Sequence, residues 1–372
     1  MTLALIAGVI LFLYPFVLYP GLLKLWRVRR RTVPEPGELP RVGLVICALN
    51  EERVIGDKLT NSFTLDYQRD RLSVYLVNDG STDRTGEIAG EFVAQGLRLI
   101  SRPQRMGKVS NLNEVVPKLA EEIVVLSDAN VIYHRQALRR LVARFDDPLI
   151  GGVSGRVVLT GTAEPLRSAE ENYYSIEWLL QERASDIYSM CGADGAMYAF
   201  RRYLFRPCPP DTIIEDFVIP MSIVRQGYRV VFESGATAME QGPASLQEEF
   251  QRKVRIAAGA AQALIRGSGW PGNAPFRFWF VFVSHKLLRW LSPLVAVAIA
   301  VLAGLDCPHP LAVLILAGMG GVAMLAAVRV LIGGPRLLDA PFYFLFSQVA
   351  AAAGLAKGLL RKQSVLWEKT NR

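Results

Sequence analysis

The distribution of charge along the chain limits its possible folds more than any other feature. Of the 76 charged residues among 372, 58 lie between positions 32 and 270, whereas eight lie between 271 and 360. A membrane-spanning helix needs about 20 apolar residues. Apolar runs occupy 3–23, 291–305, 311–333 and 341–360, and the second is long enough only if residues 287–290 extend it. The sequence therefore predicts apolar membrane segments on both sides of a polar middle region.

The first apolar run ends in a basic cluster, Lys24 followed by four arginines between 27 and 31. A cleaved signal peptide has the reverse order, with its charge before the apolar run. Because basic flanks favour the cytosolic side, we expect an uncleaved anchor and a cytosolic middle region. Four crossings would place the basic tail after residue 360 outside. Either 341–360 is therefore re-entrant or interfacial, or the tail breaks the rule.

An amphipathic helix is predicted just before the C-terminal apolar runs. Apolar residues recur at helical spacing between Leu246 and Leu264, opposite a charged face that includes Glu249, Arg252 and Arg255. Such a helix is suited to the membrane surface, and the alternative is a core-facing helix of the middle region. We therefore divide the chain into an anchor (1–31), a cytosolic domain (32–244), amphipathic or interfacial helices (245–290) and C-terminal transmembrane segments with the tail (291–372).

The net charge of +8 does not indicate a nucleic-acid partner. The middle region holds 31 acidic and 27 basic residues, so the excess of positive charge lies in the membrane flanks. Nucleic-acid binding would instead need a basic folded domain.

The middle region is predicted to be an α/β domain. Short β-rich runs at 42–48, 72–77, 97–100 and 123–126 alternate with stretches of helical length at 51–65, 83–95 and 110–121. This alternation predicts a mostly parallel sheet with helices on both faces. Ligands of such sheets bind beyond the carboxyl ends of the strands.

Acidic and amide side chains follow three of these strands. Asn50 and Glu51 come after the first, Asp79 after the second, and Asp128 and Asn130 after the fourth. Neither a G-x-G-x-x-G fingerprint nor a phosphate loop is present, which argues against a dinucleotide dehydrogenase and a P-loop ATPase. A pyrophosphate would then have to be neutralised by a metal on carboxylates, and hard oxygen ligands indicate Mg²⁺ or Mn²⁺. Asp128 is the expected ligand, with Asn130 adding an oxygen or binding through water.

Two further segments carry chemistry later in the chain. Residues 188–202 form a glycine-rich turn that contains Cys191, Gly192 and Asp194, and this turn either approaches a ligand closely or is an ordinary turn. Glu215 and Asp216 stand at a probable helix start. They act either as a helix cap or as a general base, which is typically worth 10²–10⁴ in rate.

Together these motifs resemble the membrane-bound branch of family 2 glycosyltransferases, which includes cellulose, chitin and hyaluronan synthases. The resemblance runs from about residue 41 to the last apolar segment. Its motifs begin with the run that contains Asn50 and Glu51, and continue through Val77–Ser81, Gly107–Asn113, Ser127–Asn130, Cys191–Gly192, Glu215–Asp216 and Arg252–Ile256. Each motif alone is weak, but seven in order between apolar segments are specific.

The resemblance implies a GT-A type fold and an inverting, metal-dependent displacement from a nucleotide sugar, most often a UDP-sugar. Asp216 would take the proton from the acceptor hydroxyl with support from Glu215, and Cys191, Gly192 and Asp194 would line the acceptor side. Asp128, with Asn130, would hold Mg²⁺ or Mn²⁺. The residues expected to contact the nucleotide sugar are Asn50, Glu51, Asp79, Lys108, Asp128, Arg252 and Arg255.

The sequence departs from the family pattern at two positions. The usual Asp-x-Asp motif has Asn130 in its second place, from which we expect weaker metal affinity. The Q-x-x-R-W element of polymerising members has Arg252 in place of Gln and Ile256 in place of the Trp that forms an aromatic platform. Processive synthesis is therefore in question.

Three functions remain open. The favoured one is extension of a polysaccharide or oligosaccharide at a bacterial inner membrane, with the catalytic domain in the cytoplasm. The second is transfer of one sugar to a lipid or lipid-linked acceptor, and the third is non-catalytic binding of a nucleotide sugar. Membrane lipids are expected partners, and a homo-oligomer could complete a polymer channel.

Overall fold

The computed structural model describes residues 1–25, 38–161, 166–331 and 336–364. Its strands are β1 (Val42–Ala48), β2 (Leu72–Asn78), β3 (Arg98–Ser101), β4 (Ile123–Asp128), β5 (Val131–Tyr133), β6 (Ile150–Thr160), β7 (Met197–Arg201) and β8 (Arg229–Gln241). Its helices are α1 (Thr2–Leu13), α2 (Tyr19–Leu25), α3 (Ile55–Phe63), α4 (Thr85–Gly90), α5 (Lys108–Val115), α6 (Ala137–Ala143), α7 (Leu166–Ile187), α8 (Glu215–Arg225), α9 (Leu246–Ile265), α10 (Phe276–Phe282), α11 (Leu288–Asp306), α12 (Pro310–Leu331) and α13 (Asp339–Leu359).

The strands form one eight-stranded mixed sheet in the order β3-β2-β1-β4-β7-β6-β8-β5. The half made of β3, β2, β1 and β4 is parallel. In the other half, β7 runs antiparallel to both β4 and β6, β8 is parallel to β6, and β5 is antiparallel to β8. The predicted fold class is confirmed, and the mixed half is the part that the run of early strands did not predict.

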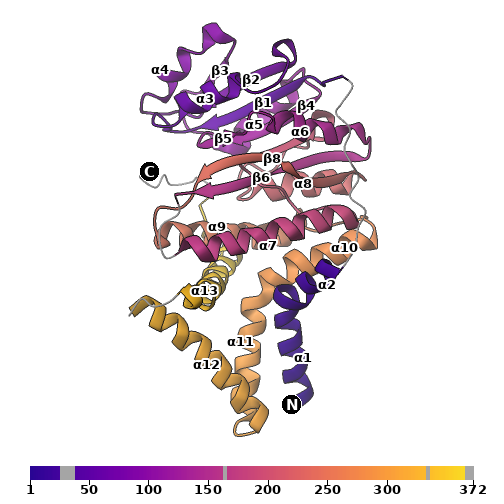
Figure 1. Ribbon diagram of the computed structural model, residues 1–372, viewed down its shortest axis with the longest axis vertical. Coiled ribbons are helices and arrows are strands. Elements are labelled where there is room, and N and C mark those ends of the chain that lie inside the picture. The colour runs from indigo at the N-terminus through magenta and orange to yellow at the C-terminus, as the bar shows by residue number, and fades with distance from the viewer. Residues whose placement is uncertain (26–37, 162–165, 332–335, 365–372) are drawn as a thin grey trace.

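Helices cover both faces of the sheet. Successive side chains of a strand point to opposite faces, so a strand can contribute to two core clusters. On β1, Val45 belongs to a core cluster that includes α5 and α8. Leu44 and Ile46 belong to a second cluster that includes α3 and α6. In Figure 1 the sheet and its helices lie above α7 and α9, while α1, α11 and α12 extend below them.

Four described helices are long and apolar enough to cross a membrane, at Thr2–Leu25, Phe276–Asp306, Pro310–Leu331 and Asp339–Leu359. The second corrects the predicted boundary at 290, because one continuous helix starts at Phe276 and passes through a π-helical turn at Val283–Leu287 into α11. No strong helix breaker lies between Pro275 and Pro293, so the helix continues through the predicted boundary.

Helix α9 forms as predicted, but it is sandwiched between the domain and α13. A Cβ added at Gly259 would lie 2.6 Å from Ile214 Cγ2 on the domain side. A Cβ at Gly354 of α13 would clash with the carbonyl oxygen of Val254. The charged face is not solvated at Glu249, which is fully buried and accepts a 2.7 Å hydrogen bond from Arg252. Helix α13 therefore covers part of the predicted charged face, and the packing of α9 on the domain agrees with the alternative of a core-facing helix.

Candidate active site

The parallel strands bring the predicted site residues to one edge of the sheet. Ala48 of β1 pairs with Asn78 of β2, and Cys47 pairs with Asp128 of β4. The segments that follow these strands therefore start side by side, as expected for carboxyl ends of parallel strands.

Asn50 ties the first two of these segments together. Its φ of 55° is unusual for a residue other than glycine, and asparagine tolerates that conformation well. Its backbone N–H donates to Ser81 Oγ over 2.9 Å, and its side-chain Oδ1 accepts from the Thr82 N–H over 2.8 Å. The Glu51 N–H donates to Thr85 Oγ1 over 2.7 Å. Asn50 and Glu51 are thus held against the loop that follows β2.

Asp79 holds the loop that leads into α5. Its carboxylate accepts from the N–H of Met106 over 2.7 Å, from the N–H of Gly107 over 2.9 Å and from Asn111 Nδ2 over 2.7 Å. The loop lies close above the strand end, since a Cβ at Gly80 would come within 2.7 Å of the Arg105 backbone nitrogen. Asp79 therefore fixes the start of α5, where Lys108 is the first residue.

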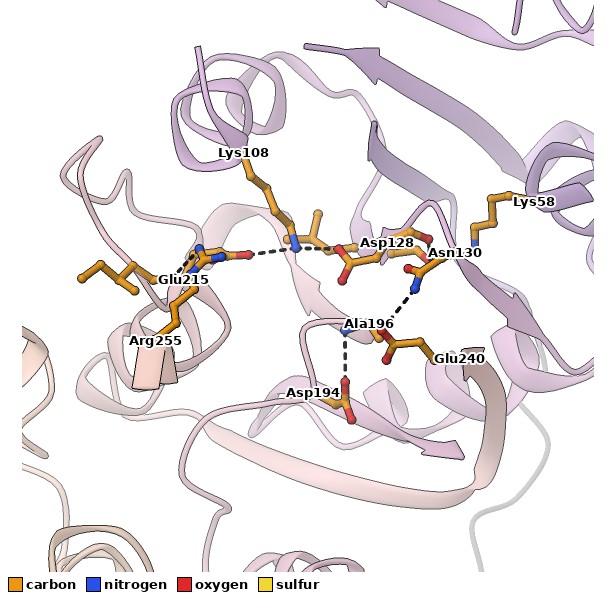
Figure 2. Close-up of polar contacts among 12 residues, drawn as sticks. Lys58, Lys108, Asp128, Asn130, Asp194, Ala196, Glu215, Glu240 and Arg255 are labelled. Carbon is orange, nitrogen blue, oxygen red and sulfur yellow. Dashed lines mark hydrogen bonds and ion pairs between the residues drawn. The ribbon is translucent and has the colours of Figure 1, made fainter. Parts of the chain in front are cut away.

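Lys108 bridges the two acidic motifs. Its Nζ lies 2.7 Å from Asp128 Oδ1 and 2.8 Å from Glu215 Oε1. Figure 2 shows this ammonium between the end of β4 and the start of α8. Burial opposes the charge, but the two carboxylates outweigh it and hold the pKa of Lys108 well above its usual value. The Asp128 side chain remains 38% exposed, so it is still open to a ligand.

Glu215 and Asp216 open α8 and have different environments. Burial acts to raise the pKa of Glu215, but the ion pair with Lys108 outweighs burial and lowers it. Burial raises the pKa of Asp216 to about 7, and the neighbouring Glu215 charge adds to this effect. Arg255 of α9 donates to the Ile213 carbonyl oxygen over 3.0 Å, and its charge favours the ionised form of both carboxyls. Paired carboxyls with separated pKa values are typical of acid–base sites.

The glycine-rich turn runs along Asp216. Gly192 has a φ of +84°, and the next N–H, of Ala193, donates to the Asp216 carbonyl oxygen over 2.8 Å. A Cβ at Gly195 would lie 3.0 Å from Asp216 Oδ2, so a larger residue there would crowd that carboxylate. Burial raises the pKa of Asp194 to about 7, and Glu240 adds to the shift.

Asn130 lies against Glu240 of β8, which sequence reasoning missed. Asn130 Nδ2 donates to Glu240 Oε1 over 3.3 Å, as Figure 2 shows. Within the described residues, no three His, Cys, Asp or Glu side chains are close enough together to form a complete metal site. One carboxylate and an amide nevertheless suit Mg²⁺ or Mn²⁺, because such ions keep several waters and bind substrate phosphates directly. The side chains of Asp128 and Asn130 therefore fit the expected metal.

Two predicted residues lie elsewhere. Cys191 is buried in the core beneath the turn, and burial raises the pKa of its thiol. Arg252 points to the helix layer, where it donates to Glu249 and, over 3.0 Å, to Tyr174 Oη. The contacts described here do not bring either side chain to Asp128 or Asp216.

Sequence reasoning also missed Lys58 and Gly195. Lys58 lies outside every motif recognised in the sequence, and Gly195 belongs to a turn with a second glycine, Gly192, from which the sequence did not distinguish it. Glu240 carried no signal because its neighbour, Asn130, is 110 residues away.

Comparison with a solved structure defines the type of fold. Mannosyltransferase PcManGT from Pyrobaculum calidifontis, solved with GDP-Man and Mn²⁺, superposes with a TM-score of 0.77 over 97% of this chain and 99% of that one, at 24% sequence identity. The fold is therefore GT-A-like, with long apolar helices at both ends.

Sequence comparison then identifies the family. The model of glycosyltransferase-like family 2 matches residues 40–259. The chain belongs to this family, because the match covers more than half of its length.

Individual relatives are more distant. Probable glycosyltransferase YdaM of Bacillus subtilis (strain 168) is 26% identical over 272 residues, which cover 69% of this chain and 65% of that protein. Beta-monoglucosyldiacylglycerol synthase of Synechocystis sp. is 36% identical over 128 residues, 33% of this chain and 27% of that protein. Poly-beta-1,6-N-acetyl-D-glucosamine synthase of Staphylococcus aureus (strain COL) is 23% identical over 235 residues, 62% and 57% respectively. The matched region spans less than two thirds of each of these relatives.

Proposed function

We propose that this protein transfers a sugar from a nucleotide sugar to an acceptor hydroxyl at the membrane, with inversion and with Mg²⁺ or Mn²⁺. The observation that carries the proposal is the Lys108 bridge, which joins the candidate metal ligand Asp128 to Glu215. The next residue, Asp216, has a pKa raised to about 7. A site for the donor diphosphate and a base for the acceptor therefore lie side by side.

Asp216 acts as the general base in this proposal. A base with a pKa near the working pH combines a large ionised fraction with strong proton affinity. Gly195 avoids the crowding of Oδ2 that a Cβ would cause, and the N–H of Ala193 fixes the backbone of Asp216. Glu215 stays ionised beside Lys108, so it maintains the raised pKa of Asp216 without competing for the proton.

The donor is bound by the ends of β1, β2 and β4. Asn50, Glu51 and Asp79 contact the nucleotide, and the Asp79 carboxylate also holds the loop before Lys108. Asp128 and Asn130 hold the metal, which when bound neutralises charge on the diphosphate. Lys108 and Arg255 supply further positive charge for the leaving nucleoside diphosphate. The GDP-Man and UDP-sugar classes are both candidates, since GDP-Man is the ligand of the mannosyltransferase with the similar fold.

Arg252, Cys191, Gly192 and Asp194 have supporting roles in this proposal. Gly192 and Asp194 line the acceptor side, on either side of Ala193, whose N–H donates to the Asp216 carbonyl oxygen. The sequence also placed Cys191 on the acceptor side and Arg252 at the nucleotide sugar. We propose that Cys191, whose side chain is buried, acts through its backbone. Arg252 acts through the helix layer, where it contacts Glu249 and Tyr174.

The acceptor is held at the membrane, and a specific observation favours a lipid-linked one over a growing polymer. The sequence favoured polymer extension. However, of the residues of α12, Ala312 and Ala326 are the buried ones, and α1 buries Leu5. Helices this open to lipid suit entry of a lipid-linked acceptor. In addition, Ile256 is 45% exposed where polymerising members carry Trp. The Synechocystis relative, a glucosyldiacylglycerol synthase, also acts on a lipid by its name.

We further propose that the catalytic domain and the C-terminal tail share the cytosolic side. Helix α13 runs parallel to α9, since Phe346 packs edge-to-face against Phe250 and a Cβ added at Gly358 would lie 2.8 Å from Ala261 Cβ. In this proposal a helix packed along α9 remains on the side of the domain and does not cross the membrane. The basic tail then lies in the cytosol, as the preference of basic residues for that side requires. A C-terminal reporter enzyme and labelling of the exposed Cys307 with an impermeant maleimide test this. The reporter should be cytosolic and Cys307 labelled from outside, and an external reporter would contradict the arrangement.

The transfer itself is tested by release of nucleoside diphosphate from detergent-purified protein. A panel of UDP- and GDP-sugars is supplied with Mg²⁺ or Mn²⁺ and membrane lipids, and products are extracted into organic solvent and also sized on a gel. Asp216→Asn should slow release by about 10²–10⁴-fold, while Asp70→Asn, the same change at an exposed position, should not. A lipid-soluble adduct supports the single-transfer function, and a long product supports polymerisation. Release at a rate close to that of the wild type in Asp216→Asn would contradict the base assignment.

A further inference from the structure

Lys58 is a fully buried lysine next to the candidate metal ligands. It lies on α3 with 0% of its surface exposed, and lysine is almost never fully buried unless it is paired. Within the described part of the chain, Lys58 forms no ion pair. A buried amine without a carboxylate partner is costly, so its contacts require an explanation.

The contacts of Lys58 account for its hydrogen-bond donors. Nζ donates to Ser127 Oγ over 2.7 Å and to the Val131 carbonyl oxygen over 2.7 Å. It also lies 4.1 Å from the centroid of the Tyr133 ring. An amine keeps two N–H donors with or without its extra proton, so both hydrogen bonds persist in either state.

The two hydrogen-bond acceptors stand on either side of the metal-binding turn. Ser127 precedes Asp128, and Val131 follows Asn130. Ser127 Oγ in turn donates to the Asp128 carbonyl oxygen over 3.2 Å. In Figure 2 Lys58 reaches this turn from the side opposite Lys108. One amine therefore closes the turn that carries both Asp128 and Asn130.

We propose that Lys58 is a positioning residue that clamps the Ser127–Val131 turn and so sets the affinity of Asp128 and Asn130 for the divalent cation. The proposal rests on the metal-dependent function proposed above. A turn with one carboxylate in place of two depends more on the placement of each ligand oxygen. Groups that orient metal ligands typically change metal affinity 10–100-fold when they are removed.

The competing explanation is that Lys58 only stabilises the fold. A variant of Asn61 serves as the control that distinguishes this role from the clamp. Asn61 also joins α3 to β5, because its side chain accepts from the Tyr133 N–H over 2.8 Å and donates to the Tyr133 carbonyl oxygen over 2.9 Å. Among the hydrogen bonds of the described residues, those of the Asn61 side chain go to Tyr133 and not to residues 127–131. Loss of Asn61 should therefore lower stability without moving the metal ligands.

The test is Mn²⁺ binding to the purified full-length protein. Free Mn²⁺ is followed by electron paramagnetic resonance, with UDP or GDP present as selected by the donor panel, and Tm is measured in parallel. Lys58→Met should weaken Mn²⁺ binding about tenfold or more, with the metal-free affinity for the nucleotide unchanged. Ser127→Ala, which removes one acceptor of the clamp, should weaken it in the same direction and carries the test if Lys58→Met does not fold. Asn61→Ala should lower Tm with Mn²⁺ affinity within about twofold. Lys118→Met, at a lysine that is 70% exposed, should change neither quantity.

The outcomes distinguish failure of the Lys58 clamp from failure of the proposed metal site. Wild-type affinity for Mn²⁺ in both Lys58→Met and Ser127→Ala would overturn the clamp and leave the metal assignment intact. Equal weakening by Lys58→Met and Asn61→Ala, in proportion to Tm, would reduce Lys58 to a structural role and overturn the clamp as well. Absence of Mn²⁺ binding by the wild-type protein would overturn the metal assignment and the clamp together.

Discussion

The pH dependence of the reaction gives a quantitative test of Asp216 as the base. An ordinary aspartate, with a pKa near 3.8, would be ionised throughout the usual assay range. Burial and the Glu215 charge instead raise the pKa of Asp216 to about 7. A base acts in its ionised form, so kcat/KM should rise with pH through this value and level off above it.

The size of the effect follows from that pKa. About one tenth of Asp216 is ionised at pH 6 and about nine tenths at pH 8, so kcat/KM should fall about ninefold between these two values and about tenfold per pH unit below pH 6. A bound divalent cation stabilises nearby negative charge, so with saturating metal the midpoint should lie at or below pH 7. Asp216→Asn should lose about 10²–10⁴ of the rate.

Glu215→Gln is the perturbation that tests the cause. It removes the negative charge that raises the pKa of Asp216 and leaves Lys108 nearby, so the acid limb should move to lower pH by about one unit or more. The assay is nucleoside diphosphate release between pH 5 and 9, with donor and metal saturation checked at each pH. A profile that is flat from pH 5.5 to 8, or a limb that does not move in Glu215→Gln, would refute the reasoning.

Three further changes test other parts of the structure. Lys108→Met removes the cation between two carboxylates; release of nucleoside diphosphate should fall at least about 10²-fold, and activity within threefold of wild type would contradict the bridge. Glu177→Gln leaves Lys286 and Arg289 without the carboxylate that both contact, which should cost about 3–5 kcal/mol of stability. Thermal unfolding in detergent measures this, and an unchanged Tm would contradict it. Gly354→Leu should destabilise the α9–α13 packing by about 1–3 kcal/mol or more, whereas Gly318→Leu, where a Cβ meets nothing within 4 Å, should not; equal Tm values for the two variants would show that the helix contact is unimportant.

Local patterns predicted much of the fold. The first strand, Val42–Ala48, has the predicted bounds, because a buried strand between polar turns carries its signal within a few residues. The ends of the apolar helices were also close to prediction for the same reason. The predicted start of the second apolar helix, at residue 291, was too late, because the helix begins at Phe276. Its aromatic first turn was interpreted as a separate interfacial segment.

Tertiary contacts decided what the sequence did not show. Lys58 stands in a short amphipathic helix where a lysine is expected to face solvent, and its burial depends on a turn about 70 residues away. Glu249 likewise reads as part of a charged face, but α13 covers it from about 90 residues further on. Periodicity cannot report such partners, because it describes one element at a time.

Asn130 shows how a departure from a family motif can be consistent with its surroundings. The pairing of Val131 with Glu240 places β8 directly beside the turn, and Asn130 Nδ2 donates to the Glu240 carboxylate. An aspartate at 130 would set two carboxylates against each other, next to Asp194, whose pKa is already raised to about 7 by burial and by Glu240. Like charges at such distances disfavour ionisation. An amide satisfies Glu240 with its N–H group and keeps an oxygen for a cation. The negative charge that the motif lacks is therefore present at the same place, contributed by a strand that joins the sheet more than 100 residues later.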